Sequence, residues 1–413
     1  MTTSNRNFYF INGNFVEILN STIVTNNLNI LSLPLESTIM IFDNIQTKII
    51  DSMWVVNCSS NWTTPVIKII SKGANAYLTQ ISNSFFSNNR LFYPSDNQAG
   101  VILFVTSDNE VILIENSVFN SNLILPTIIV DQVGGACARL TGANLNISIS
   151  DSIFQNNQAI FGCNCIEFDG FELDINNTIF KNNTNYLPPI NKDIVESDGY
   201  GGSIYSIGGN LKINNSIFTQ NMNYFGGNIY LDGNLQRQQM IVNIDQSNFI
   251  DNYAHTFGSS IYVADKILHL RLYLTGSLIY RDWANYNSAI YLSYNSIDAI
   301  TYFLFSQFIE NWSDFAPVLD YECEAGVSYI KNCSFLNNTA CWFPRDPGKY
   351  VANNNDDYGC GGALFINAKS GPSTMYIYSE NNVFSMNYAT ATGAIFITIG
   401  GNFTDNNSIF SFN

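Results

Sequence analysis

The stretch SIFTQNMNYFGGNIYL, Ser216–Leu231, contains the two short phrases that decide the fold. The first phrase is a hydroxyl residue or Asn, an apolar residue, Phe, two spacers and Asn, and it returns about a dozen times along the chain. The second is a pair of small residues followed by an apolar and aromatic run, as in FGSSIYV at Phe257–Val263. Self-similarity at a nearly fixed period is the sequence signature of a repeat architecture.

A third stretch, of alternating or β-branched residues, leads from the second phrase to the next copy of the first, as in NLKINNSIF at Asn210–Phe218. Three short β segments in a repeat of about 26–31 residues correspond to one coil of a parallel β-solenoid. No long stretch repeats apolar residues at helical spacing. The sequence therefore predicts an all-β fold, a parallel β-helix (solenoid) of about 13 coils with three short strands per coil.

The Phe of the first phrase is expected to form a ladder in the core. Equivalent residues of neighbouring coils stack about 4.8 Å apart, and each aromatic pair adds roughly 0.5–1.5 kcal/mol beyond its burial. The Asn three residues later is expected to form an amide ladder at a corner, where left-handed backbone is also tolerated. In degenerate copies, Val24, Trp54 and Tyr280 are assigned to the Phe position. The predicted ladder residues are Phe86, Phe119, Phe154, Phe180, Phe218, Phe249, Phe308, Phe335, Phe384, Phe410, Asn157, Asn183, Asn221 and Asn252.

The paired phrases GG(A/S/N)(I/L) and Phe-x-x-Asn resemble the repeat of the polymorphic outer-membrane protein family. That repeat also occurs in surface proteins of single-celled eukaryotes, within the pectin-lyase-like β-helix superfamily. The resemblance extends from about Ile23 to Asn413. It implies a right-handed solenoid, exposure at a cell surface, and a role in adhesion or structure.

Composition narrows the class of partner. Only 12% of the 413 residues are charged, and the net charge is −16. Seventeen Lys and Arg residues without a basic stripe argue against nucleic acid. No linker rich in Pro, Gly or Ser interrupts the repeats, so a single domain spanning 1–413 is expected.

The expected location is extracellular or at the cell surface, with no membrane insertion within this segment. No run of 18 or more apolar residues predicts a membrane-spanning helix. The first ten residues, MTTSNRNFYF, lack the layout of a signal peptide. Because a surface protein needs an export signal, we expect this chain to be a segment of a longer precursor.

Eight cysteines suit a set of disulfides. One candidate pair brackets the largest insertion, one lies across a corner, and one occupies equivalent positions in adjacent coils. The alternative is that several are buried free thiols, since free Cys is among the most buried residue types. The candidate pairs are Cys341 with Cys360, Cys323 with Cys333, and Cys137 with Cys165.

Twelve Asn-x-Ser/Thr acceptors are present, although about nine would arise by chance in so Asn-rich a chain. Some of them also belong to the structural repeat. The candidate N-glycosylation sites are Asn61, Asn146, Asn182, Asn311, Asn337 and Asn402.

Insertions enter the repeat at one place, between the Phe strand and the small-residue strand. They occupy about 87–99, 120–133, 181–200 and 339–360. Loops on a common edge of a solenoid form a joint surface, and solenoid function tends to lie there. The alternative is that an insertion packs down over the side of a coil. The candidate binding loop contains Trp342, Phe343, Arg345, Lys349 and Tyr350, because aromatic residues beside basic ones suit a protein or sugar contact.

No catalytic, cofactor-binding or metal site is predicted. The two His residues, His255 and His269, are isolated, and the chain has no nucleophile elbow, phosphate loop or zinc-protease motif. We therefore expect a non-enzymatic structural or adhesive protein without a cofactor. It would serve as a rigid stalk or fibril building block that binds proteins, by self-assembly or among neighbouring surface proteins, with glycan as a further partner class. The alternatives are a carbohydrate-active β-helix enzyme and an intracellular β-helix scaffold.

Overall fold

The residue contacts of the chain cluster into two compact units, Met1–Ile217 (unit 1) and Phe218–Asn413 (unit 2). The sequence offers no linker to divide them, but each coil of a solenoid contacts only its neighbours, so contacts cluster locally. The structure, a computed structural model, describes residues 8–24, 40–57, 59–60, 65–72, 75–92, 103–107, 109–125, 135–159, 162–185, 199–233, 239–264, 267–293, 298–314, 316–322, 325–340, 361–367, 375–389, 392–397 and 401–413.

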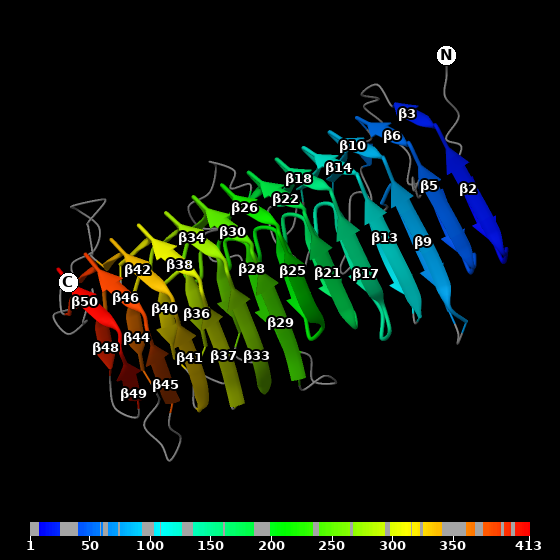
Figure 1. Cartoon of the computed structure of the whole chain (residues 1–413). Helices are drawn as coiled ribbons and strands as arrows, with labels where there is room; N and C mark the ends of the chain where they lie inside the picture. Colours follow the sequence, from blue (N-terminus) through cyan, green and yellow to red (C-terminus); the bar gives the residue numbers. More distant parts are fainter. Residues whose placement is uncertain are drawn as a thin grey trace. The chain divides into compact units, whose positions relative to one another are not determined.

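Each unit is a right-handed parallel β-helix, as predicted. Every strand pairing among the described residues is parallel, and equivalent residues of successive coils lie in register. Figure 1 shows the strands of each unit following one another from coil to coil. The described residues form seven coils in unit 1 and six in unit 2, in agreement with the predicted thirteen. They contain no helix, and so none that could cross a membrane.

Complete coils contain four strands, one more than the sequence predicted, and these form sheets A, B, C and D. The additional strands, those of sheet D, have only two or three residues and directly follow the Asn of the first phrase. A run this short carries no readable alternation, which is why the repeat alone did not reveal it.

In unit 1 the strands of sheets A and B are longer than those of sheets C and D. Sheet A contains β1 (Phe8–Ile11), β4 (Met40–Asp43), β8 (Ile67–Ser71), β12 (Leu103–Ser107), β16 (Ala138–Thr141), β20 (Ile166–Asp169) and β24 (Ile204–Ile207). Sheet B contains β2 (Phe15–Leu19), β5 (Thr47–Asp51), β9 (Tyr77–Ser82), β13 (Glu110–Glu115), β17 (Asn146–Ser150), β21 (Glu172–Asn176) and β25 (Asn210–Asn214). Sheet C contains β3 (Thr22–Val24), β6 (Trp54–Val56), β10 (Phe85–Ser87), β14 (Val118–Asn120), β18 (Ile153–Gln155), β22 (Ile179–Lys181) and β26 (Ile217–Thr219), within which the two units divide. Sheet D contains β7 (Ser59–Ser60), β11 (Arg90–Phe92), β15 (Leu123–Leu125), β19 (Gln158–Ala159) and β23 (Thr184–Asn185).

Unit 2 repeats the same order of sheets. Sheet A contains β28 (Ile229–Asp232), β32 (Ile261–Val263), β36 (Ile290–Leu292), β40 (Leu319–Tyr321), β44 (Leu364–Ile366) and β48 (Ile395–Ile397). Sheet B contains β29 (Gln239–Asp245), β33 (His269–Thr275), β37 (Asp298–Leu304), β41 (Gly326–Lys331), β45 (Met375–Glu380) and β49 (Gly401–Asn406). Sheet C contains β30 (Asn248–Ile250), β34 (Leu278–Tyr280), β38 (Gln307–Ile309), β42 (Ser334–Leu336), β46 (Val383–Ser385) and β50 (Ile409–Ser411). Sheet D contains β27 (Met222–Asn223), β31 (Tyr253–Ala254), β35 (Trp283–Ala284), β39 (Trp312–Ser313), β43 (Thr339–Ala340) and β47 (Tyr388–Ala389).

The Phe side chains of the first phrase form a column on the inner face of sheet C in each unit. In unit 1 the ring centroids of Phe119 and Phe154 are 4.6 Å apart and the planes differ by 1°. In unit 2 Phe335 lies 4.8 Å from Phe308 and 4.7 Å from Phe384. Nine of the ten predicted Phe side chains are buried, and Phe410 keeps 47% of its surface exposed.

The three degenerate assignments to this column were wrong by one residue. Ile23, Val55 and Ile279 pair in register with the column, in place of Val24, Trp54 and Tyr280. Side chains alternate between the two faces of a strand, so a shift of one residue moves a side chain from the core to the surface. Accordingly, Trp54 is 53% exposed.

The Asn three residues after each Phe forms a buried amide ladder, as predicted. Asn311 Nδ2 donates to Asn338 Oδ1 (3.0 Å) and to the carbonyl of Ile279 in the preceding coil (3.1 Å), and its main-chain N–H donates to the same Oδ1 (3.0 Å). The same arrangement recurs in unit 1, where Asn157 Nδ2 donates to Asn183 Oδ1 (3.0 Å) and to the carbonyl of Phe119 (3.0 Å). Asn221 and Asn252 are buried in the corresponding ladder of unit 2. Each amide therefore satisfies groups from both neighbouring coils.

A second ladder consists of the hydroxyl residues two positions before the Phe. Ser247 and Ser277 are buried; Ser277 Oγ accepts from the main-chain N–H of Ser247 (3.1 Å) and donates to the carbonyl of Thr275 (2.9 Å). The left-handed corner residue lies just before each ladder residue, and is not the ladder Asn itself: Gln246 has φ 47° and Glu310 has φ 56°. The small pair supplies a third such corner, with Gly226 at φ 61°.

The structure does not support the two predicted disulfides that include a described cysteine, Cys137 with Cys165 and Cys323 with Cys333. Cys137 and Cys165 lie side by side in adjacent coils, as expected, but both are buried free thiols. In-register neighbours have parallel Cα–Cβ bonds, so their Cβ atoms stay about 4.8 Å apart, beyond the roughly 3.5–4.5 Å that a disulfide requires. Cys333 is also free; it replaces Ser in the hydroxyl ladder, where its Sγ donates to the carbonyl of Phe303 (3.3 Å). Cys323, Cys341 and Cys360 lie outside the described residues.

Candidate binding face

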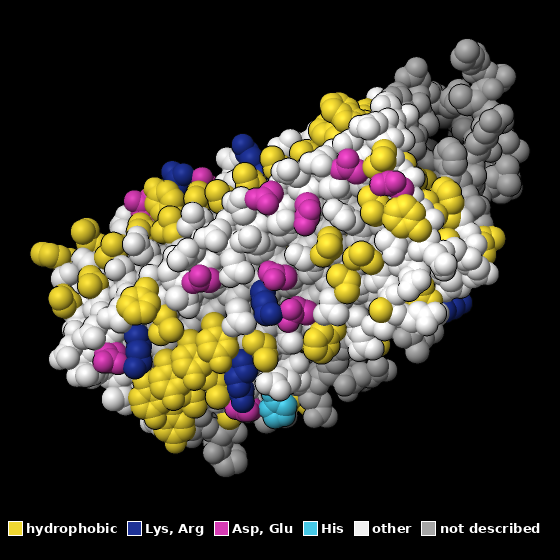
Figure 2. Space-filling view, turned by 45° about the vertical axis from the view of Figure 1, so that its right-hand side comes forward, with side chains coloured by type: hydrophobic (Ala, Val, Ile, Leu, Met, Phe, Trp, Pro, Cys, Tyr) yellow, Lys and Arg dark blue, Asp and Glu magenta, His cyan; other side chains and the backbone are white. Residues whose placement is uncertain are grey.

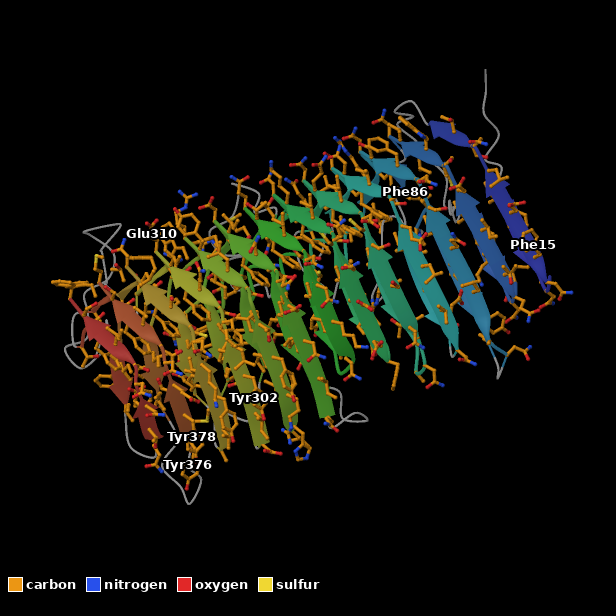
Figure 3. The ribbon with its side chains drawn as sticks, in the orientation of Figure 1. Phe15, Phe86, Tyr302, Glu310, Tyr376 and Tyr378 are labelled. Atoms are coloured by element: carbon orange, nitrogen blue, oxygen red, sulfur yellow. The ribbon has the colours of Figure 1, made fainter. Side chains whose placement is uncertain are left out.

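A column of four tyrosines runs along the outer face of sheet B in unit 2. Tyr273, Tyr302, Tyr329 and Tyr378 come from β33, β37, β41 and β45 and pair in register. Successive ring centroids are 4.8, 5.0 and 5.4 Å apart, and the planes differ by at most 18°. Alternation in these strands sends the intervening residues into the core and the tyrosines outward. Figure 3 shows Tyr302 and Tyr378 on this side of the ribbon.

A parallel row widens this face. Ile300, Val327 and Tyr376 lie in register two residues before the tyrosines. Tyr376 and Tyr378 are 43% and 41% exposed. We call these seven side chains the tyrosine face: Tyr273, Tyr302, Tyr329, Tyr378, Ile300, Val327 and Tyr376. In Figure 2 a broad continuous hydrophobic area of this kind has Lys or Arg side chains at its border.

Ion pairs border the tyrosine face at both ends of its strands. At the start, Asp298 accepts from Arg271 Nη2 (3.0 Å) and lies 3.3 Å from His269 Nδ1. The hydrogen bond from Arg271 lowers the pKa of Asp298. At the other end Lys331 Nζ is 2.7 Å from Glu380 Oε2. A hydrophobic centre with a polar, charged rim is the usual anatomy of a protein–protein interface.

The stacking determines which parts of the tyrosine rings are exposed to a partner. Each ring face is covered by the next ring in the column, so ring edges and hydroxyl groups are presented outward. Sugar stacking uses open ring faces, which the interior of this column lacks. No described tyrosine of the column makes a hydrogen bond through its hydroxyl to a protein group, so these groups remain available to a partner.

No family model, curated protein or solved structure matches this chain. What the structure supports of the resemblance is the parallel β-solenoid itself.

The predicted loop-bearing edge has a common origin. The four insertions were predicted to begin too early, because the first part of each contains a regular strand, β11, β15, β23 or β43. All four are strands of sheet D, so the remaining inserted residues enter at one position of the coil. The candidate binding residues of the largest insertion lie outside the described residues, namely Trp342, Phe343, Arg345, Lys349 and Tyr350.

The predicted glycosylation sites differ in accessibility. Asn182, Asn337 and Asn402 are exposed, and Asn146 is half-buried. Asn311 is fully buried and its amide nitrogen is committed to the Asn ladder, so the prediction for this site was wrong. Asn61 lies outside the described residues.

Unit 1 contains an ion pair inside the coil that the sequence analysis missed. Lys48 Nζ lies 2.9 Å from Glu110 Oε1, and both side chains are fully buried. Glu110 also accepts from Thr79 Oγ1 (2.5 Å) and Ser71 Oγ (2.9 Å). Burial lowers the pKa of Lys48, while Glu110 opposes that shift. The complete set of partners makes this a structural ion pair.

A second pair in unit 1 lies on sheet A. Arg139 Nε is 3.3 Å from Glu167 Oε1, and both side chains are largely buried. Burial raises the pKa of Glu167, although Arg139 lowers it in part. Among the described residues no group of three or more His, Cys, Asp or Glu side chains lies together in a metal-binding arrangement.

Proposed function

We propose that this chain is a non-enzymatic structural or adhesive protein of the cell surface or extracellular space, and that its β-helix binds other proteins through an exposed face. The observation that carries this proposal is the tyrosine face of unit 2. Large exposed apolar areas rimmed by polar residues mark interaction sites, and Tyr is enriched where proteins bind one another.

Rigidity supports the same proposal. The tyrosine rings are held by stacking on sheet B strands whose inner faces are buried, as at Leu272 and Phe303, and the Phe column follows in sheet C of the same coils. A face that is already ordered loses little conformational entropy when it binds, and this improves affinity. The loop-bearing edge along sheet D is the second surface that we propose for partners.

The resemblance to polymorphic outer-membrane repeats supplies the reason for a surface location. Within this proposal the chain belongs to the pectin-lyase-like group of right-handed β-helices, and its partners are other copies of the chain or neighbouring surface proteins.

An intracellular scaffold is the second candidate, and one observation favours it. The four cysteines of the described residues, Cys137, Cys163, Cys165 and Cys333, are all free and buried. Burial raises the pKa of Cys333 to about 12, so it stays a protonated thiol. Peptide mass spectrometry of protein from its native source separates the two candidates: sugar on Asn182, Asn337 or Asn402 supports the surface protein, and bare Asn at all three supports the scaffold.

Binding itself is tested with a double variant, Tyr302→Ser with Tyr329→Ser. We measure self-association by sedimentation velocity and retention on the source cells after washing. The matched control is Phe171→Ser, which removes an aromatic residue that is 50% exposed in unit 1. The double variant should lose at least about tenfold in either readout while its unfolding transition stays cooperative, since hot-spot residues of this kind typically contribute 2 kcal/mol or more. Equal behaviour of double variant and control removes the tyrosine face from the proposal.

A further inference from the structure

An acidic side chain interrupts an aromatic column on sheet A of unit 2. The rings of Tyr230 and Tyr262 are 4.8 Å apart, and those of Tyr262 and Tyr291 are 5.3 Å apart. In the next coil the register places Asp320 opposite Tyr291, and after it Phe365 continues the column. Because its neighbours on both sides in the register are aromatic, the carboxylate needs its own explanation.

Asp320 is fully buried, and neither of its carboxylate oxygens has a hydrogen-bond donor. A buried charge without a partner is strongly unfavourable, and native structures normally pair it or place a cation beside it. Among the described residues of sheet A in unit 2, Asp320 is therefore the buried polar side chain with the fewest hydrogen bonds.

A second carboxylate lies on the same side of the strand. Glu322 follows β40 and continues its pairing, because its main-chain N–H donates to the carbonyl of Leu292 (2.9 Å). Side chains two residues apart on an extended strand point the same way. Tyr291 donates its hydroxyl hydrogen to Glu322 Oε2 (2.6 Å) and thereby fixes the orientation of this carboxylate. Burial, and then the nearby Glu322, raises the pKa of Asp320.

We propose that Asp320 and Glu322 bind one divalent cation of the calcium class, and that Tyr291 positions Glu322 for it. The ligand atoms of these side chains are all oxygens, whereas zinc sites are typically built from nitrogen and sulfur ligands. Ca²⁺ accepts irregular sets of carboxylate, carbonyl and water ligands, whereas Mg²⁺ demands near-octahedral geometry and retains several waters. Because the described residues provide no third acidic or His side chain here, main-chain carbonyls and water complete the shell.

The ion would neutralise two like charges on sheet A and so stabilise the folded unit. This inference is independent of the tyrosine face, which lies on sheet B. It predicts that the stability of the protein depends on Ca²⁺ at neutral pH, where the competing proton is scarce.

The test uses the full chain at pH 7.5. Terbium luminescence, sensitised by nearby tyrosine, reports ion binding directly, and Ca²⁺ should displace Tb³⁺ with a stoichiometry of one. Thermal unfolding in EDTA and in 1 mM Ca²⁺ gives the second readout, and Ca²⁺ should raise the Tm of the native protein. Asp320→Asn keeps the shape, removes one charge, and should lose at least tenfold in ion affinity while its Tm in EDTA rises above that of the native protein.

The matched control is Glu310→Gln, which removes an exposed carboxylate of the same unit and should leave ion binding and the Ca²⁺-dependent Tm unchanged. Two results overturn the proposal. One is the absence of a saturable Tb³⁺ signal together with a Tm that Ca²⁺ does not change. The other is an ion affinity that Asp320→Asn leaves intact, which would place the ion elsewhere.

Discussion

Asn252 Nδ2 donates to Asp282 Oδ1, 3.0 Å away, at the one described coil of unit 2 where the amide ladder contains an acid. Asp282 Oδ2 accepts from Ser260 Oγ, and the main-chain N–H of Asp282 donates to Asn311 Oδ1 (3.0 Å). Burial raises the pKa of Asp282 to about 7, although the hydrogen bonds from Ser260 and Asn252 lower it in part. The ladder thus contains one group that titrates near neutral pH.

We predict that this group makes stability fall as the pH rises. A carboxyl with a raised pKa holds its proton in the folded state where the unfolded chain, with a pKa near 3.9, has released it. The stabilisation is complete below pH about 4 and is lost as the pH rises to about 7, by roughly 4 kcal/mol for the full shift. Asp282→Asn should remove this dependence and raise the free energy of unfolding most at pH 8. Urea titrations at pH 4 and pH 8 check this against Glu310→Gln. A variant that gains no more at pH 8 than at pH 4 contradicts it.

The amide ladder should be costly to interrupt. Asn338→Ala removes the acceptor of two donors of Asn311 and the donor to the carbonyl of Phe308. Buried groups left unsatisfied cost about 1–3 kcal/mol each, so we expect a loss of roughly 3 kcal/mol or more in urea unfolding. Asn402→Ala, at an exposed position of β49, should cost less than about 0.5 kcal/mol. Equal losses in the two variants would show that the ladder amides contribute no specific stability.

The Phe column is tested at Phe335, which stacks on Phe308 and Phe384 and is fully buried. Phe335→Ala should lower the free energy of unfolding by about 3–5 kcal/mol, because it leaves a cavity and breaks two stacked pairs. Phe171→Ala, at a half-exposed position, provides the comparison. A Phe335→Ala protein with the native unfolding curve would reject the register of sheet C.

The interior ion pair of unit 1 should show strong coupling. Lys48→Met alone leaves Glu110 buried with an unpaired charge, which costs about 3–5 kcal/mol. The double variant Lys48→Met with Glu110→Leu should be more stable than Lys48→Met, because apolar replacements of a buried pair are often neutral. Urea unfolding of the double-mutant cycle measures the coupling. A double variant whose loss equals the sum of the single losses would mean that the pair is not coupled.

The architecture could be predicted from sequence because each ladder repeats a residue type. Ser117, Phe119 and Asn122 of one coil are bonded to or stacked on the same residue types in the next coil, so the preference of each position is repeated many times in the sequence. The register of atypical coils was harder to predict. Between Thr275 and Tyr280 no Phe marks the core, and adjacent apolar residues left Ile279 and Tyr280 equally eligible.

The binding face could have been found in the sequence, but the shifted register obscured it. Tyr273, Tyr302, Tyr329 and Tyr378 each lie six residues before the core anchor of their coil once Ile279 is that anchor. A contact that occurs only once in the chain produces no periodic signal in the sequence. Lys48 and Glu110 are far apart in sequence and meet only because their coils stack, and the burial of Asp320 depends on the packing around sheet A.

The most direct test of the proposed function is photo-crosslinking in the cells that make this protein. A photoreactive phenylalanine analogue in place of Tyr302 probes the centre of the tyrosine face, and the same analogue in place of Val111, 41% exposed on sheet B of unit 1, is the control. Our account predicts a discrete protein crosslink, either a second copy of this chain or one defined neighbour, from position 302 and none from position 111. The account would be contradicted by no protein crosslink at position 302, or by the same products from both positions.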